Sequence, residues 1–391
     1  MSRTKAFLVC LTLSLLLSLP TSGALANRAE VEGLATGQQE EIVIGVYEPM
    51  TGAQAAGGEL TMQGVYLAHE ARPEVLGLPI RLVLVDNRSD KAESATAVQR
   101  LIDQEGAVAI IGSYGSSNAM AGGEVAERAG VPVMGCSPTN PLVTEGKDYY
   151  FRACFIDPFQ GSVMAKYAVE ELGVEHVAII QDVAQDYSVG LAAFFREAFI
   201  ALTGDAKGIV AFTAYQTGDQ DFTAQLASVM SKEPDAIYAP GYFGDGALLA
   251  RQAREMGYQG YILGADAWEA PELIEIGGSA AEGILITSHY HPEAELSSAS
   301  QPFVEVFVEE YDERPSAFAA LGYDAYMLVV DAIERAGSAD PQAIRDAMAE
   351  TTDYEAVTGT ITLDKNGDAV KDAVILKVED EEFKYVGTVK P

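Results

Sequence analysis

The chain has 391 residues, with 25 Lys and Arg against 58 Asp and Glu, so its formal net charge at pH 7 is −33. Nucleic acid and anionic membrane surfaces repel so acidic a protein, and we expect neither as a partner. The length exceeds what one hydrophobic core usually serves, which predicts two domains.

The first residues have the pattern of an export signal. Arg3 and Lys5 supply the charged start, an apolar core spans 6–19, and the Ala-Leu-Ala at 24–26 is a small-x-small cleavage site. The apolar core is too short to cross a membrane as a helix. We therefore expect residues 1–26 to be a cleaved signal peptide, and the protein to reach the periplasm or the cell exterior.

Three cysteines bear on this interpretation. Cys10 lies inside the apolar core and lacks the small residue before it that lipoprotein processing requires, so a lipid anchor is the weaker alternative. After cleavage, Cys136 and Cys154 remain as an even pair in an oxidising compartment. A disulfide between them and two buried free thiols are both open.

After a stretch at 27–40 that is expected to be a flexible leader, apolar runs and helical patterns alternate. The first set predicts strands at 42–46, 80–86, 107–111 and 131–134, and helices at 60–71, 91–104 and 118–129. After an extended stretch at 149–155, the second set predicts strands at 177–181, 209–212, 236–238, 261–263 and 283–286, and helices at 159–172, 188–202, 222–230 and 246–256. This alternation predicts a doubly wound parallel sheet in each half, hence an α/β protein.

The C-terminal part follows another pattern. Helices predicted at 302–311, 323–336 and 341–350 leave no room for parallel strands between them, so the chain is expected to return to the first domain after about residue 287. The tail predicts antiparallel strands at 359–363, 373–378 and 383–386, with a turn at 365–368. We therefore assign 41–155 and 288–362 to an N-terminal lobe, and 156–287 and 363–391 to a C-terminal lobe.

The turn at 112–118 joins a buried strand to a helix and has the sequence Gly-Ser-Tyr-Gly-Ser-Ser-Asn. Ser116 or Ser117 is the expected N-cap, and the first helical turn presents free N–H groups and the positive end of the helix dipole. Such a turn at the carboxyl edge of a parallel sheet suits a small anion such as a carboxylate. A capped helix without a ligand is the alternative.

Common catalytic motifs are mostly absent from the sequence. It has no Gly-x-Ser-x-Gly, no His-Glu-x-x-His, no P-loop and no dinucleotide fingerprint. His289 and His291 would point to opposite faces of an extended segment, so they would not share a metal. The acidic residues at 364–368 lack the glycine position and the closing glutamate of a calcium loop. We therefore expect neither an enzyme nor a metal or other cofactor.

Small polar and aromatic residues gather where the predicted strands end. Loops at the edges of two sheets that hold hydroxyls, an acid and several aromatics can enclose a small amphiphilic molecule. These segments are Cys136-Ser137-Pro138-Thr139-Asn140-Pro141, Asp186-Tyr187, Gly241-Tyr242-Phe243 and Gly264-Ala265-Asp266-Ala267-Trp268.

A longer series of segments extends this pattern over nearly the whole mature chain. The series comprises Ile44-Gly45, Met50-Thr51-Gly52, Ile110-Ile111-Gly112, Ser116-Ser117, Pro138-Thr139-Asn140-Pro141, Phe151-Arg152, Asp157-Pro158-Phe159-Gln160-Gly161, Asp186-Tyr187, Ala250-Arg251-Gln252-Ala253, Ala281-Glu282-Gly283 and Gly322-Tyr323-Asp324-Ala325-Tyr326. In order and spacing it resembles the type I periplasmic solute-binding proteins of the leucine/isoleucine/valine-binding family, the receptors of branched-chain amino acid ABC importers. The resemblance implies two α/β lobes, joined by a three-segment hinge, that close on a ligand.

The resemblance also implies a set of ligand-binding residues. Ser116 and Thr139 would hold the carboxylate of an amino acid, while the Ser137 carbonyl and Asp266 would hold its ammonium group. Hydroxyls at a helix start suit the anion, and a carboxylate suits the cation. With the aromatic residues around the side chain and the rest of the turn, the expected set is Tyr114, Ser116, Ser117, Ser137, Thr139, Tyr187, Tyr242, Asp266 and Phe318.

The sequence departs from the family pattern in ways that concern the pocket. Asp266 is one methylene shorter than the glutamate often found there, so either the lobes close further or a water intervenes. Gly57-Gly58 stand where a branched-chain binder can have a tyrosine over the ligand, which should enlarge the pocket, whereas Tyr114 and Trp268 should narrow it elsewhere. An amino acid is favoured, but the choice among leucine, isoleucine and valine does not follow.

The sequence therefore predicts an extracytoplasmic receptor that binds an amino acid between two lobes. It would act as a monomer and pass its ligand to the permease subunits of an ABC importer in the membrane. The alternatives are a ligand-sensing protein for signalling and a binder of an amide or a short peptide. An enzyme would need a nucleophile and a base that the sequence does not place together.

Overall fold

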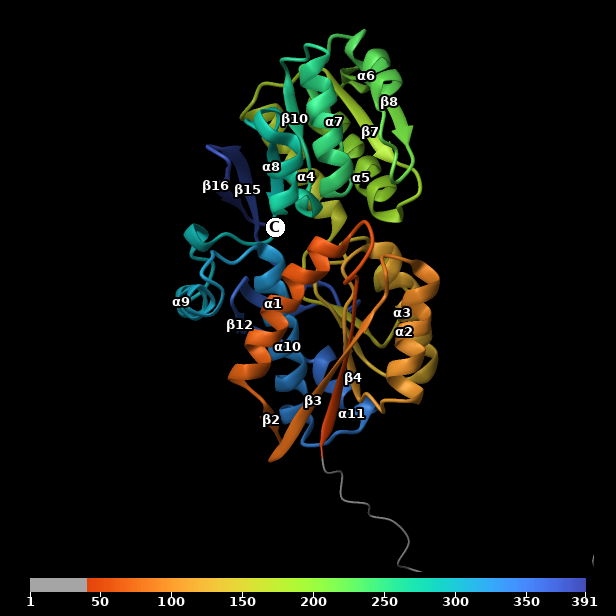
Figure 1. Cartoon of the computed structure of the whole chain (residues 1–391), viewed down its shortest axis with the longest axis vertical. Helices are drawn as coiled ribbons and strands as arrows, with labels where there is room; N and C mark the ends of the chain where they lie inside the picture. Colours follow the sequence, from red (N-terminus) through yellow and green to blue (C-terminus); the bar gives the residue numbers. More distant parts are fainter. Residues whose placement is uncertain (1–40) are drawn as a thin grey trace, which may run out of the picture. The chain divides into compact units, whose positions relative to one another are not determined.

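The computed structural model describes residues 41–391. The predicted signal peptide at 1–26 and leader at 27–40 lie outside the described residues. In the described part, two large sheets are each covered by helices (Figure 1). Both sheets belong to one compact unit. We call the sheets with their helices the first lobe and the second lobe, in chain order.

The first sheet is built from the apolar runs of the N-terminal part and has the strand order β2-β3-β1-β4-β5-β6. Every residue of β1 (Ile42–Glu48) is buried, because a parallel strand with helices on both faces needs apolar side chains on both. The other elements are β2 (Glu74–Val75), β3 (Leu78–Asp86), β4 (Ala109–Ile111), β5 (Val133–Gly135), β6 (Tyr150–Arg152), α1 (Ala55–Ala71), α2 (Lys91–Asp103) and α3 (Ser116–Ala129).

The second sheet has the order β16-β15-β11-β10-β9-β7-β8. Its parallel strands are β7 (Val177–Asp182), β8 (Ile209–Tyr215), β9 (Ala236–Tyr238), β10 (Tyr261–Leu263) and β11 (Leu285–Ser288). Its helices are α4 (Asp157–Glu170), α5 (Asp186–Thr203), α6 (Thr223–Met230), α7 (Phe243–Glu255) and α8 (Pro271–Gly277). Short 3-10 turns lie at Pro141–Val143, Ala206–Gly208, Asp266–Trp268, Gly278–Ala280 and Pro292–Ala294.

The parallel strands of both sheets follow one order, β3-β1-β4-β5-β6 in the first and β8-β7-β9-β10-β11 in the second. The direction of winding therefore reverses between β1 and β4, and again between β7 and β9. Open α/β sheets bind ligands outside the carboxyl ends of the strands at such switch points. The predicted α/β fold of two doubly wound lobes is confirmed.

After β11 the chain forms α9 (Ser300–Tyr311), α10 (Ala317–Ala336) and α11 (Pro341–Ala349). Helix α10 runs against α1 (Figure 1) and contributes to the core of the first lobe. Their backbones touch, because a Cβ on Gly64 would lie 1.7 Å from the Ala319 carbonyl oxygen and one on Gly322 would lie 2.2 Å from that of Thr61. Only glycine at both positions allows this approach.

The C-terminal strands divide between the lobes. β12 (Tyr354–Ala356), β13 (Gly359–Leu363) and β14 (Ala369–Val370) form a small antiparallel sheet, and β15 (Ala373–Glu379) and β16 (Glu382–Val389) extend the second sheet. The predicted turn at 365–368 joins β13 to β14 as a hairpin. The lobe boundaries drawn from the sequence stay a prediction.

Some local predictions were wrong. Neither Ser116 nor Ser117 is the N-cap of α3, because Gly115, with φ of 86°, leads the chain into the helix and leaves both hydroxyls to other contacts. α10 begins earlier than predicted, since the Ser316 hydroxyl accepts a hydrogen bond from Ala319 N and caps it there. α8 was not predicted because it is too short to show a helical period.

Cys136 and Cys154 are buried free thiols. Of the two alternatives left open by the sequence, the structure has the pair of thiols and not the disulfide. Each cysteine follows an apolar strand into the core of the first lobe, where a thiol packs as a small apolar group.

Candidate ligand-binding site

The turn between β4 and α3 is fixed by side chains at the ends of neighbouring strands. Glu48, at the end of β1, accepts a hydrogen bond from Tyr114 N at 2.6 Å, and Asn87 donates from Nδ2 to Ser113 Oγ at 2.7 Å. Burial raises the pKa of the Glu48 carboxyl to about 8, so this acid is neutral at pH 7. The turn is therefore held in one conformation at the switch point of the first sheet.

The loop after β5 is held by a buried arginine. Arg152, at the end of β6, donates to the carbonyl oxygens of Pro138 at 2.7 Å and Asn140 at 2.9 Å. Its Nε lies 2.7 Å from Asp368 Oδ1, in the hairpin between β13 and β14. Arg152 thus ties a loop of the expected site to the hairpin between β13 and β14.

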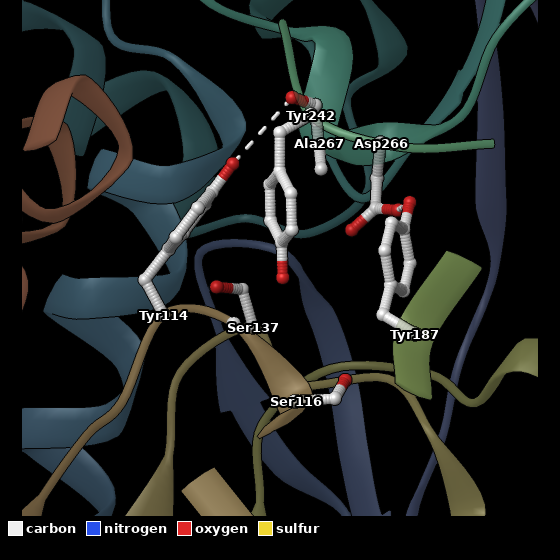
Figure 2. Close-up of a pocket in the computed structure, with 8 residues that line it drawn as sticks. Tyr114, Ser116, Ser137, Tyr187, Tyr242, Asp266 and Ala267 are labelled. Carbon is white, nitrogen blue, oxygen red and sulfur yellow. Dashed lines mark hydrogen bonds between the residues drawn. The ribbon is translucent and has the colours of Figure 1, made fainter. Parts of the chain in front are cut away.

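These loops and three loops of the second lobe line a small cavity (Figure 2). Both lobes contribute side chains to it, and six of the nine predicted site residues line it. The lining residues are Tyr114, Gly115, Ser116, Ser137, Tyr187, Tyr242, Asp266 and Ala267.

Three of the predicted residues lie outside the lining of this cavity. The Ser117 hydroxyl donates to Asp186 Oδ2 at 2.9 Å, so it joins the lobes instead. The Thr139 hydroxyl is buried and interacts with the Asp157 carboxyl instead. Phe318 packs behind Tyr114, with ring centroids 5.0 Å apart at an interplanar angle of 81°.

The carboxylate of Asp266 is held by three donors. Tyr187 OH and Gln160 Nε2 each lie 2.6 Å from Oδ1, and His289 Nε2 lies 3.0 Å from Oδ2. Burial alone would raise the pKa of the Asp266 carboxyl, but the hydrogen bonds from His289, Tyr187 and Gln160 together lower it. Asp266 is therefore an ionised acid at the cavity.

Gln160 and His289 were not among the residues expected at the site. His289 follows β11 just as the other site residues follow their strands, yet it was considered only as a metal ligand with His291. Gln160 lies in the first turns of α4, where its side chain bonds both Asp266 and the Thr287 hydroxyl. Position after a strand was the available signal for His289, and for Gln160 the signal was its place in the family-like segment at 157–161.

The cavity carries a net negative charge. None of its eight lining residues is cationic, and Asp266 is ionised. A second acid, Asp157, is fully buried nearby, and burial raises its pKa to about 8, so it is neutral at pH 7. A ligand with a positive group beside Asp266 would balance this charge.

The Ser137 hydroxyl lines the cavity and has no hydrogen-bond partner within residues 41–391. A buried polar group without a partner costs about 1–3 kcal/mol, so this hydroxyl favours a ligand that can bond it. Ser116 Oγ accepts a hydrogen bond from Asn140 N at 3.1 Å, which leaves its own proton available to an acceptor in the cavity.

Two expectations about pocket size were wrong. Gly57 does not enlarge the pocket, because a Cβ there would lie 2.3 Å from Tyr114 Cζ, which means that the Tyr114 ring fills the space above it. Trp268 does not narrow the pocket, because its ring packs on Gly246 and Gly264 in the core of the second lobe. In each case a large ring occupies the volume that the glycine leaves.

Within residues 41–391 no helix is long and apolar enough to cross a membrane. In the same range no three His, Cys, Asp or Glu side chains come together in a way that could hold a metal ion.

Comparison with known proteins relates this geometry to other chains. A family model described as periplasmic binding protein matches residues 41–382. An amino acid binding protein of Pseudomonas aeruginosa is 30% identical over 360 residues, which cover 90% of this chain and 94% of that protein.

Two solved structures are also similar. A leucine-binding protein from Thermotoga maritima has a TM-score of 0.87 and 46% identity, over 90% of this chain and 99% of the other. A branched-chain amino acid transporter substrate-binding protein from Streptococcus pneumoniae, in complex with isoleucine, has a TM-score of 0.84 and 33% identity, over 90% of this chain and all of the other. The match runs through both lobes, and the chain belongs to the periplasmic binding protein family.

Proposed function

We propose that this protein binds an amino acid between its two lobes and delivers it to the permease of an ABC importer. The proposal is supported by the Pseudomonas relative, which is an amino acid binding protein, and by the solved relatives that bind leucine and isoleucine. One observation in the structure carries it further. The ionised Asp266 and the start of α3 face one cavity from opposite lobes (Figure 2).

These two features suit the two charges of an amino acid. The carboxylate of the bound amino acid would accept hydrogen bonds from the Ser116 hydroxyl and the first N–H groups of α3, with Thr139 close by. The ammonium group would bond Asp266 and the Ser137 carbonyl, where its charge balances that of the site. Its side chain would lie among Tyr187, Tyr242 and the other aromatic rings. Ser117 and Phe318 would act indirectly, through lobe closure and packing.

The wider role follows from family membership. A binding protein that closes around a solute presents it to membrane subunits and carries out no reaction on it, so we assign no enzymatic activity. We place the protein outside the cytoplasm, where cleavage of the signal peptide after residue 26 would release it. We expect it to act as a monomer. The signalling and amide-binding alternatives have less support, because the relatives above with named roles bind amino acids.

A melting screen tests the proposal directly. A ligand that binds only the folded state stabilises it by roughly 2.7 kcal/mol at one hundred times its dissociation constant. The screen should cover the common amino acids, their amides, short peptides, sugars and dicarboxylates, with mass spectrometry of small molecules released from the denatured protein. A shift with at least one amino acid is expected. A shift with a sugar or a dicarboxylate and with no zwitterion would contradict the proposal.

A further inference from the structure

Tyr114 and Gly57 fit together as a pair across the wall of the cavity. The ring carbons Cζ, Cε2 and Cε1 of Tyr114 lie 2.3–2.6 Å from where a Cβ on Gly57 would be. Contacts this short leave no space for any side chain at residue 57 while the ring stays in place. The Tyr114 side chain, only 1% exposed, therefore occupies space that α1 leaves open.

Other contacts fix the ring in this position. Tyr114 N is bound to the buried Glu48, and the edge of the ring packs on Phe318. The hydroxyl points across to the second lobe, where it donates to the Ala267 carbonyl oxygen at 3.5 Å (Figure 2). Backbone, ring and hydroxyl are thus each restrained, and the ring is a rigid part of the wall.

Tyr114 lies at the end of the cavity away from Asp266. The Tyr114 and Tyr242 ring centroids are 5.8 Å apart, those of Tyr242 and Tyr187 are 5.6 Å apart, and Tyr187 bonds Asp266. Figure 2 shows the same succession, with Tyr242 between Tyr114 and Asp266. An ammonium group held at Asp266 directs the ligand side chain along this row of rings towards Tyr114.

We infer that Tyr114 is the specificity-determining residue that limits the length of the ligand side chain. Gly57 makes this possible, because the absence of a side chain there leaves room for the Tyr114 ring. The inference rests on the proposed function, since it assumes a ligand anchored at Asp266. It assigns the chain to amino acids with compact aliphatic side chains, because Tyr114, Tyr187 and Tyr242 line the small cavity and leave little room beyond their rings. Aromatic side chains would meet the Tyr114 ring.

The test compares the ranking of ligands and not only their affinity. Valine, leucine, methionine, phenylalanine and tryptophan are titrated by calorimetry into the parent, Tyr114→Ala, Tyr114→Leu and Tyr114→Phe. Removal of the ring should raise the affinity for phenylalanine relative to that for valine by roughly tenfold or more. Even one methylene group of extra space in an apolar pocket changes the preference between ligands by about that factor. Tyr114→Phe keeps the ring and loses the bond to Ala267, so it should change all affinities by a common factor.

Gly57→Ala provides an independent test from the other side of the pair. Its Cβ should push the ring into the cavity, so affinity for leucine should fall more than affinity for valine. Tyr66→Ala is the matched control, because Tyr66 lies on the same helix but is 43% exposed, and it should leave every affinity unchanged.

Two results separate this inference from the proposed function. Equal loss for all ligands in Tyr114→Ala and Tyr114→Leu, with the ranking unchanged, would overturn the role of Tyr114 while leaving amino acid binding intact. A parent that binds another class of solute would overturn the proposed function. The same variants would then be titrated with a homologous series of that class, and an unchanged ranking would again overturn the inference.

Discussion

His289 lies directly behind Asp266, with its Nε2 3.0 Å from Asp266 Oδ2. The imidazole is fully buried and packs on the Phe155 ring, with centroids 3.8 Å apart. Burial lowers the pKa of the His289 imidazole below its usual 6.5, so the ring is neutral and donates its Nε2–H to the carboxylate. A neutral donor holds Asp266 in place without cancelling its charge, which leaves that charge for a ligand.

Asp266→Asn should weaken ligand binding strongly. The substitution keeps the size of the side chain but leaves a buried ammonium group without its counter-charge, which costs on the order of 2–5 kcal/mol. Affinity should fall by roughly thirtyfold or more, measured by calorimetry with the ligand found in the melting screen. Ser116→Ala should cost less, because the N–H groups of the α3 start remain. Full affinity in Asp266→Asn together with loss in Ser116→Ala would identify the ligand as an anion.

Acidification should weaken both binding and stability. A protonated His289 would pair with Asp266 and cancel the charge that attracts the ligand. Because its pKa is lowered in the folded state, the unfolded chain takes up this proton first, so the free energy of unfolding falls as pH drops below about 6.5. Asp266 acts in the same direction. Its pKa is lowered in the folded state, so the stability that its ionised carboxylate contributes is lost as the pH falls through its folded-state pKa.

The group responsible can be identified with His289→Gln, because glutamine can donate from Nε2 but does not titrate. Dissociation constants and melting temperatures measured from about pH 8 to pH 4 should show a weaker pH dependence in this variant than in the parent. Lys371, whose charge also lowers the His289 pKa, is unchanged in both proteins. Identical pH profiles would show that His289 does not contribute.

The lobes should be held closed in part by Asp186. Its Oδ2 accepts from Ser117 Oγ at 2.9 Å and lies 3.0 Å from Lys91 Nζ, while Asn140 Nδ2 donates to its carbonyl oxygen at 2.9 Å. Asp186 and Lys91 are about half exposed, and exposed pairs contribute 0.2–1 kcal/mol. Lys91→Ala should therefore speed ligand release by up to about fivefold, and less so at high salt.

Lys166→Ala is the control for this prediction. Its ion pair with Glu170 is similarly exposed but lies within α4 and does not join the lobes. Stopped-flow release rates should match those of the parent in this variant. Equal effects of Lys91→Ala and Lys166→Ala would show that the contacts at Asp186 do not stabilise the closed form.

Cys136 and Cys154 should titrate as free thiols only after unfolding. Burial raises the pKa of the Cys154 thiol to about 12, and that of Cys136 rises for the same reason. Both are therefore protonated, inaccessible and slow to react in the folded protein. A thiol reagent added to unfolded, non-reduced protein should count two groups, and a count of none would show that a disulfide forms.

The positions of the main site residues could be predicted from the sequence. Ser116, Ser137 and Asp266 each follow a buried apolar run, and the carboxyl ends of parallel strands meet at one edge of a sheet. Periodicity alone identified most strands and helices, and the bounds of β9 and β10 agree with the structure. Hydrophobic periodicity and the rule on the carboxyl ends of parallel strands were sufficient to place these residues.

The partners of those residues could not be predicted in this way. Asp266 is held by Tyr187, Gln160 and His289, which come from three elements far apart in the sequence. Spacing along the chain places each residue at the end of an element but does not say which side chain it meets. Contacts such as Ser117 with Asp186 depend on how the two lobes close.

The sequence by itself determined the class of fold, the sheet edges that line the cavity and the acid that carries its charge. Only the tertiary structure decided the shape of the pocket. Gly57 suggested an enlarged pocket until the Tyr114 ring was found in the same space, and Trp268 suggested a narrower one until its ring was found on Gly246. Interiors are close-packed, so the volume left by one residue is filled by another that sequence proximity does not identify.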